Sequence, residues 1–295
     1  MYIQYVQKIR HDEILRFVST IKYSKQIIVN EEMTIDTKEL INARNGDAAD
    51  PHVFIKSLPK VELHAHLNGC IRDTTLFELA EERGVSLNEH HFATEPTDYN
   101  NSMYNVRPRS LQDCFDMFAE IPKCVDDLVA LARITSEALQ DFAKENVVYL
   151  ELRSTPKQLL VATSGSEIAD KRDYCITILK SIKDFEQRDE ARYNQELEKG
   201  VQFPRVPMMC RFLVAIDRSQ SVENAWEHVQ LAENLKREFK DSVVGVDFCG
   251  NPTKGHFNNF QAAFQKARAS GLRITLHCGK LFARYNLLAR IRSNS

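Results

Sequence analysis

The chain has 295 residues and a formal net charge of −2, from 39 basic and 41 acidic side chains. Hydrophobic residues make up 43% and charged residues 27%, which is typical of a globular protein and excludes a disordered chain, a collagen and a coiled coil. The balanced charge argues against a nucleic-acid partner. No apolar run approaches the roughly 20 residues that cross a bilayer, so no membrane partner is expected.

Residues 1–51 are polar and irregular, and we interpret them as an N-terminal extension that is poorly ordered or partly helical. From residue 58 the pattern changes to strands that alternate with helices. The first strand is predicted at Val61–Leu67. Helices follow it at Asp73–Arg83, with Asp73 as the N-cap and Gly84 as the stop signal, at Ser110–Ile121 and at Val125–Glu145, with a long loop over residues 86–109.

The second half of the chain repeats a strand-then-helix unit. The predicted elements are a strand at Val147–Thr155, a helix at Glu167–Glu196, a strand at Met208–Asp217, a helix at Val222–Phe239, a strand at Val243–Cys249, a helix at Phe257–Ala269 and a strand at Leu272–Cys278. These five strands are rich in β-branched residues, which favours parallel βαβ units in an α/β fold.

Two parallel architectures fit this alternation, a doubly wound open sheet and a (β/α)8 barrel of the TIM type. The first strand is not followed by a Gly-rich phosphate loop, so the doubly wound dinucleotide fold loses its main support. A complete barrel has eight strands. We therefore expect residues 52–280 to form an incomplete barrel with about five of the eight strands.

Three histidines lie where barrel enzymes carry their chemistry, at the C-terminal ends of strands. His64 and His66 are two residues apart on the first predicted strand, so their side chains share one face. His277 ends the fifth predicted strand. Each of these histidines alone is more simply explained as a structural residue, but three imidazoles meeting at one edge would suit a catalytic zinc site.

Cysteine ligands are not expected to contribute to such a site. The sequence has seven cysteines, an odd number, and no CxxC motif. In a chain of this length they indicate reduced thiols and a cytoplasmic location.

Six motifs in chain order resemble the adenosine deaminase family of metal-dependent amidohydrolases. They are SLPKVELHAHLNG (57–69), SLQDCFDMF (110–118), VVYLELRSTPK (147–157), LVAIDRS (213–219), GVDFCGNP (245–252) and ITLHCG (274–279). The first of these motifs has asparagine at position 68, Asn68, and in this it resembles the adenosine deaminase-like branch of the family. Members of that branch remove methylamine from N6-methyl-AMP. The resemblance covers about residues 56–279.

The resemblance implies a zinc-dependent hydrolytic deaminase of purine nucleotides or nucleosides, with one zinc ion per chain and a small-molecule substrate, in a family whose members are often monomeric. By position, His64, His66 and His277 match the zinc ligands. Further matches to substrate-binding positions are His66, Asn68, Ser154, Thr155, Pro156, Lys157, Asp217 and Gly250.

The sequence departs from the family pattern at Lys280, which stands where the resemblance predicts the glutamate that handles the proton. No catalytic residue is therefore expected to be intact, and residues 281–295 are interpreted as a basic tail foreign to the family. We expect a truncated isoform that holds zinc weakly or not at all and is inactive as a deaminase. The alternative is a non-catalytic remnant that binds a ligand.

Overall fold

The computed structural model describes residues 56, 58–87, 111–163, 165–201 and 204–278. The predicted extension at 1–51, most of the loop at 86–109, Lys280 and the tail at 281–295 lie outside the described residues. The elements below belong to one compact unit that begins at Lys60. None of the helices in these described ranges has both the length and the apolar character needed to span a bilayer.

Five parallel strands form the central sheet, as the sequence predicts. They are β1 (Lys60–His66), β2 (Val147–Ser154), β5 (Met209–Asp217), β6 (Val243–Cys249) and β7 (Arg273–Leu276). The order across the sheet is β1-β2-β5-β6-β7, so each strand pairs with the next one along the chain. This is the order of a (β/α)8 barrel, and the sheet is a curled part of one.

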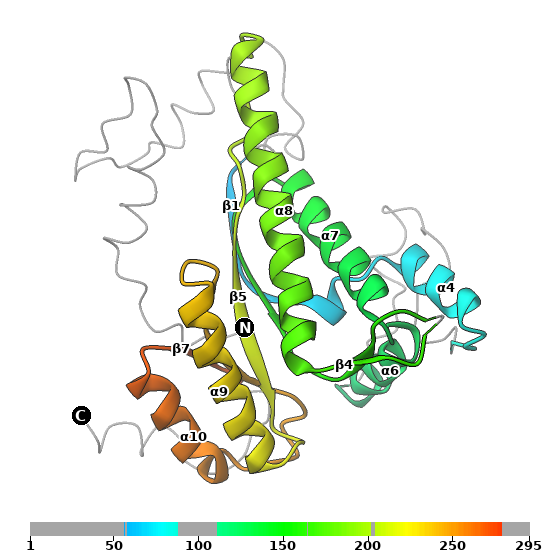
Figure 1. Cartoon of the computed structure of the whole chain (residues 1–295), viewed down its shortest axis with the longest axis vertical. Coiled ribbons are helices and arrows are strands. Elements are labelled where there is room, and N and C mark those ends of the chain that lie inside the picture. Colours follow the sequence, from blue (N-terminus) through cyan, green and yellow to red (C-terminus); the bar gives the residue numbers. More distant parts are fainter. Residues whose placement is uncertain (1–55, 57, 88–110, 164, 202–203, 279–295) are drawn as a thin grey trace. The chain divides into compact units, whose positions relative to one another are not determined.

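Helices connect successive strands and cover one face of the sheet (Figure 1). They are α4 (Asp73–Glu82), α6 (Leu111–Cys124), α7 (Leu128–Lys144), α8 (Lys171–Glu198), α9 (Val222–Glu238) and α10 (Phe257–Ala269). A short 3-10 turn, η1 (Leu67–Gly69), follows β1 directly. The helices thus form an outer layer, and the other face of the curled sheet faces its interior.

Alternate side chains of β6 point either to the hydrophobic core or to the interior of the curled sheet. Phe248 points toward α10, and its ring centroid lies 5.1–5.5 Å from those of Phe257, Phe260 and Phe264. Asp247 and Cys249 lie one residue to either side of Phe248, so they face the sheet interior instead. The outer face of the strand therefore anchors the helices, while the inner face carries polar groups toward the site.

Several boundaries differ from the sequence-based expectations, and at two helix starts an aspartate side chain decides where the helix begins. The helix predicted from Glu167 begins only at Lys171. Ile168–Ala169 is instead the strand β4, which pairs with β3 (Leu159–Leu160) in an antiparallel hairpin. Asp170 then starts α8, because it forms a reciprocal capping box with Asp173.

The helix predicted from Val125 begins at Leu128, because Asp127 accepts a hydrogen bond from the Ala130 amide and caps it. The N-cap of α4 is Arg72 rather than Asp73, and Asp73 lies in the first turn. The strand β7 ends at Leu276, so His277 and Cys278 follow the strand rather than end it.

Candidate metal centre

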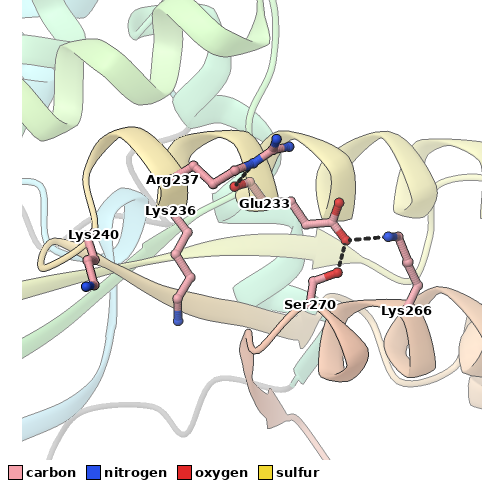
Figure 2. A pocket seen from close by; sticks show the side chains of 6 residues that line it. All are labelled: Glu233, Lys236, Arg237, Lys240, Lys266 and Ser270. Carbon is pink, nitrogen blue, oxygen red and sulfur yellow. Dashed lines mark hydrogen bonds and ion pairs between the residues drawn. The ribbon is translucent and has the colours of Figure 1, made fainter.

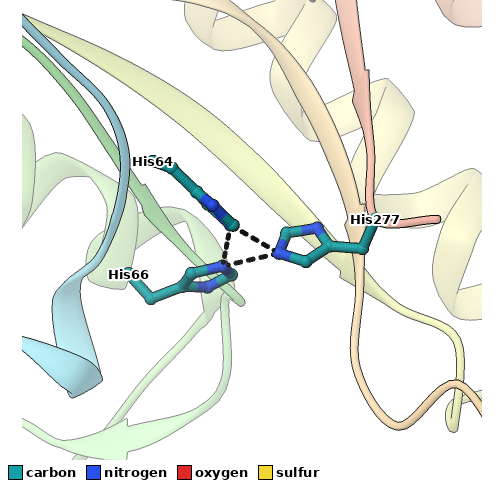
Figure 3. Close-up of side chains that lie close together, drawn as sticks. All are labelled: His64, His66 and His277. Atoms are coloured by element: carbon teal, nitrogen blue, oxygen red, sulfur yellow. Dashed lines mark hydrogen bonds between the residues drawn. The ribbon is translucent and has the colours of Figure 1, made fainter. Parts of the chain in front are cut away.

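The histidines His64, His66 and His277 converge at the C-terminal edge of the sheet (Figure 3). The Nε2 atom of His277 lies 2.6 Å from that of His64 and 3.0 Å from that of His66. The Nε2 atoms of His64 and His66 are 3.2 Å apart. The structure thus brings together the three residues that the sequence predicts as a set.

These side chains come from opposite edges of the sheet, and Arg153 explains how the edges meet. Arg153 is on β2 beside His66, and its guanidinium donates a hydrogen bond to the Leu63 carbonyl of β1. It also donates to Asp247 on β6 at 3.1 Å and to Thr275 on β7 at 3.3 Å. One buried side chain therefore links β1, β2, β6 and β7 across the interior of the curled sheet.

The surroundings of His66 and His277 indicate how these two rings carry their protons. Burial lowers the pKa of His66 to about 3, although the nearby Asp247 carboxylate opposes the shift. His66 is therefore neutral near pH 7. The Nδ1 atom of His277 lies 3.1 Å from the Phe248 carbonyl oxygen, so Nδ1 carries the proton and Nε2 has a free lone pair.

A cation fits this arrangement better than hydrogen bonding among the rings does. Each neutral imidazole has one N–H, and His277 uses its own on Phe248, so three Nε2 atoms in one triangle cannot all be satisfied by each other. Two nitrogens bound to a tetrahedral Zn2+ at about 2.0–2.1 Å are about 3.3 Å apart, close to the longer spacings here. The three histidines therefore suit a metal of this kind.

Asn68 lies on η1, immediately after the two histidines of β1. Its Oδ1 atom is buried and has no hydrogen-bond partner among the described residues. A buried acceptor without a partner costs free energy, so a ligand that donates a hydrogen bond here would be favoured.

The end of β2 and the three residues after it include four of the predicted substrate-binding residues, which differ in their surroundings. The Ser154 hydroxyl is buried and lies 2.6 Å from the Tyr174 hydroxyl of α8, so it already has a partner on the helix side. Pro156 is buried, and the Thr155 hydroxyl lies 4.0 Å from the Cys249 sulfur. Thr155 therefore contacts the end of β6.

Lys157 lines an open pocket of about 360 Å³ together with Pro122, Asp126 and the β3–β4 hairpin. Burial lowers the pKa of the Lys157 ammonium, and the charge of Asp126 opposes that shift. An anion in this pocket would offset the cost of burying the ammonium.

Asp217 and Gly250 form one tight junction at the ends of β5 and β6. The Asp217 Oδ1 atom accepts hydrogen bonds from the amide and the hydroxyl of Ser219, both at 2.8 Å. Gly250 has a φ of +93°, and a Cβ atom there would lie 2.1 Å from that Oδ1 atom. Only glycine fits, so Gly250 permits the close approach of Asp217.

Sequence reasoning missed the buried charges beneath the histidines. Arg153 and Asp247 are 2% and 0% exposed. The available signal was a charged residue in an otherwise apolar strand, since such residues are seldom buried without a partner. A second omission is Arg218, which donates to the His277 carbonyl at 2.7 Å and fixes the chain just after β7.

A second open pocket, of about 620 Å³, lies between α9 and α10 (Figure 2). Two of its cationic side chains have partners: Lys266 pairs with Glu233 at 3.2 Å, and Lys236 donates to the Gly271 carbonyl at 2.9 Å. The pocket lies where α9 and α10 end, before β6 and β7 begin, which is the sheet edge opposite to the histidines. It therefore belongs to the helix layer rather than to the candidate centre.

Comparison with known proteins identifies related chains. A family model described as Adenosine deaminase matches residues 59–288. The N6-mAMP deaminase of Arabidopsis thaliana is 40% identical over 236 residues, which cover 77% of this chain and 62% of the relative. The N6-methyl-AMP deaminase of Danio rerio is 35% identical over 229 residues, covering 78% of this chain and 58% of the relative.

Solved structures give the same relationship. The crystal structure of Arabidopsis ADAL complexed with GMP matches with a TM-score of 0.62 and 36% identity, over 81% of this chain and 64% of that one. The chain thus spans about three fifths of the length of the relatives that it matches.

Proposed function

This chain belongs to the adenosine deaminase family, and from that premise we propose that its histidine edge serves the hydrolytic removal of the C6 amino or methylamino group of a purine nucleotide. The observation that carries the proposal is the convergence of three Nε2 atoms that lie 2.6–3.2 Å from one another. The unpartnered Oδ1 atom belongs to Asn68, two residues after His66 in the chain. We propose N6-methyl-AMP as the substrate, because the similar Arabidopsis and Danio proteins carry that name.

We propose that the metal is zinc and that His64, His66 and His277 hold it. Zinc in such a site supplies a Lewis acid that makes hydroxide available near neutral pH. The protein contributes three imidazoles, and the lowered pKa of His66, about 3, keeps that ring in the form that binds cations. Asn68 would accept a hydrogen bond from the substrate through Oδ1 and so orient it next to the metal.

The phosphate end of the nucleotide would meet Lys157. Its ammonium lies in a pocket, and desolvation makes a positive charge there favour an anionic partner. Thr155 lies two residues before Lys157 in the chain, and its hydroxyl lies 4.0 Å from the sulfur of Cys249 on β6. That placement supports a nucleotide rather than a nucleoside as the preferred ligand, and the ADAL complex with GMP is consistent with it.

Because Lys280 replaces the expected glutamate, we expect slow deamination at a site that can still bind its substrate. Positioned proton transfer contributes roughly 10²–10⁴-fold to a rate, and an ammonium cannot replace a carboxylic acid in that role. We therefore propose that the 295-residue chain binds N6-methyl-AMP but releases methylamine at least about 100-fold more slowly than the Arabidopsis relative. Ligand binding without turnover is the second candidate function, and Lys280 is the observation that favours it.

The test measures binding and turnover separately on the purified chain with one equivalent of Zn2+. Calorimetry with N6-methyl-AMP should detect binding, and Lys157→Met should weaken it about tenfold without changing the binding of N6-methyladenosine. Lys180→Met, a change at an exposed lysine of α8, is the matched control. Equal affinities for nucleotide and nucleoside would reject the phosphate site. Fast methylamine release by the unmodified chain would reject the effect assigned to Lys280.

A further inference from the structure

A buried carboxylate lies beneath the three histidines and has no role in the function proposed above. Asp247 on β6 is 0% exposed, and its charge is retained by specific partners. Asp247 forms a buried ion pair with Arg153, whose guanidinium lies 3.1 Å from Oδ1, and Thr275 and His277 contact the same carboxylate. An ionised carboxylate is costly in this position, which raises the question of what it does.

The two oxygens of Asp247 have different surroundings. The Oδ1 atom accepts hydrogen bonds from Thr275 at 2.5 Å and from Arg153 at 3.1 Å. The Oδ2 atom is buried, lacks a hydrogen bond of standard geometry among the described residues, and lies 3.3 Å from the His277 Nδ1 atom. Arg153 and Thr275 therefore fix the carboxylate and leave one oxygen directed at the imidazole.

His277 is held from its Nδ1 side by two acceptors. The Phe248 carbonyl is 3.1 Å away, but it already accepts the backbone N–H of His277 at 2.8 Å. The Asp247 carboxylate carries a full negative charge, and charged acceptors bind an N–H more strongly than neutral ones. Both acceptors place the proton on Nδ1, and Nε2 is then free to face His64 and His66.

We propose that Asp247 is a positioning residue that keeps His277 in the Nδ1–H tautomer with its Nε2 lone pair directed at the metal position, and that Arg153 is the counter-charge which makes this possible. The inference rests on the proposed role of the three histidines as metal ligands. Carboxylate partners of ligating imidazoles typically change metal affinity by about 10–100-fold.

A competing arrangement would make Asp247 a ligand itself. Donor atoms of His66, Asp247 and Cys249 lie within 4.8 Å of one another. Two observations weigh against this set. Arg153 lies 3.1 Å from the carboxylate and would repel a cation, and burial raises the pKa of the Cys249 thiol, which disfavours the thiolate that metals bind.

Asp247→Asn is the informative variant because it keeps the shape of the side chain but places a hydrogen-bond donor, instead of an acceptor, opposite the Nδ1 atom of His277. Arg153 and Thr275 hold the amide oxygen at the Oδ1 position, so the NH2 group takes the Oδ2 position and faces Nδ1. An amide donor there favours the Nε2–H tautomer, which places a proton where the metal would bind. An equivalent aspartate-to-asparagine change in a catalytic triad acts through the wrong tautomer in this way.

The experiment uses the full chain without metal first, and 15N NMR of the imidazoles reports the tautomer of His277. We expect Nδ1–H in the parent chain and a shift toward Nε2–H in Asp247→Asn. This readout does not require the proposed function to be correct. An unchanged tautomer in a folded variant would overturn the inference, and Asp247→Ala provides a second measurement if the asparagine variant does not fold.

Competition with a chromogenic chelator then gives Zn2+ and Co2+ affinities. Asp247→Asn should lose about 10–100-fold and Asp247→Ala less, whereas Cys249→Ser, two residues away on the same face, should match the parent. A sulfur-to-cobalt charge-transfer band that disappears in Cys249→Ser would overturn the proposal in favour of the competing ligand set. Failure of the parent chain to bind either metal would instead reject the proposed function, and the NMR result would still decide the tautomer.

Discussion

At the scale of single residues, His228 shows how a buried histidine can be structural rather than catalytic. It lies on α9 and is 0% exposed. Its Nδ1 atom donates to the Ala215 carbonyl at 3.1 Å, and Nε2 has no hydrogen-bond partner among the described residues. Burial lowers the pKa of His228 to about 4, with the charge of Lys171 acting in the same direction. The ring is therefore neutral in the folded chain, and among the described residues no cluster of possible metal-binding side chains includes it.

This burial predicts a pH-dependent stability. Below pH 6.5 the unfolded chain takes up a proton at His228, while the folded chain does not until about pH 4. Stability is therefore lost as the pH falls through this window, by about 2 kcal/mol near pH 5 for this residue. The variant His228→Gln removes that contribution. Urea unfolding of both chains from about pH 7.5 to pH 5 tests the prediction, and parallel stability curves would contradict it.

At the scale of elements, two helices begin with aspartate caps in different environments. Asp127 at the start of α7 is 2% exposed and accepts from Ala130, Arg83 and Thr163. Asp170 at the start of α8 is exposed and bonds within its own helix turn. The first cap therefore joins α7 to other segments, and the second acts locally.

The two caps should differ in their contribution to stability. Asp127→Ala leaves the buried Arg83 with one carboxylate fewer, and we expect a loss of about 3 kcal/mol. Asp170→Ala removes an exposed cap and should cost about 1 kcal/mol. Chemical denaturation of both variants measures the difference in the free energy of unfolding. Equal losses would show that the tertiary partners of Asp127 add nothing to its capping role.

These elements also mark the limits of sequence reasoning. The bounds of β6 and α10 agree with the prediction, because strand alternation and helical periodicity are local patterns. The β3–β4 hairpin was missed because two-residue strands have no periodicity to detect. The true starts of α7 and α8 depend on which aspartate finds a backbone amide, which composition alone does not reveal.

At the scale of the whole molecule, the candidate centre joins the two edge strands of the described sheet. His64 and His66 on β1 meet His277 after β7, more than 200 residues later in the chain. A metal ion held by these three side chains would link the two edges directly. Because the unfolded chain does not hold the three imidazoles together, binding would favour the folded state.

Metal addition should therefore stabilise the fold. Zn2+ at about 100 times its dissociation constant should raise the free energy of unfolding by about 2.7 kcal/mol. His277→Ala should remove most of this gain, whereas His228→Gln, whose histidine lies outside the centre, should retain it. Thermal unfolding with and without Zn2+ after chelator treatment measures the effect. An equal gain in His277→Ala would mean that zinc binds elsewhere.

The sequence by itself determined the class of fold, the five parallel strands and the set of three histidines, because each depends on local alternation or on motifs in chain order. Only the tertiary structure decided that the edges of the sheet curl until His277 reaches His64, and that Arg153 and Asp247 support this approach. It also revealed the unpartnered Oδ1 of Asn68 and the partnered hydroxyl of Ser154. The physical reason is range: strand and helix patterns repeat over a few residues, whereas burial, pairing of charges and the meeting of side chains depend on segments far apart in the chain.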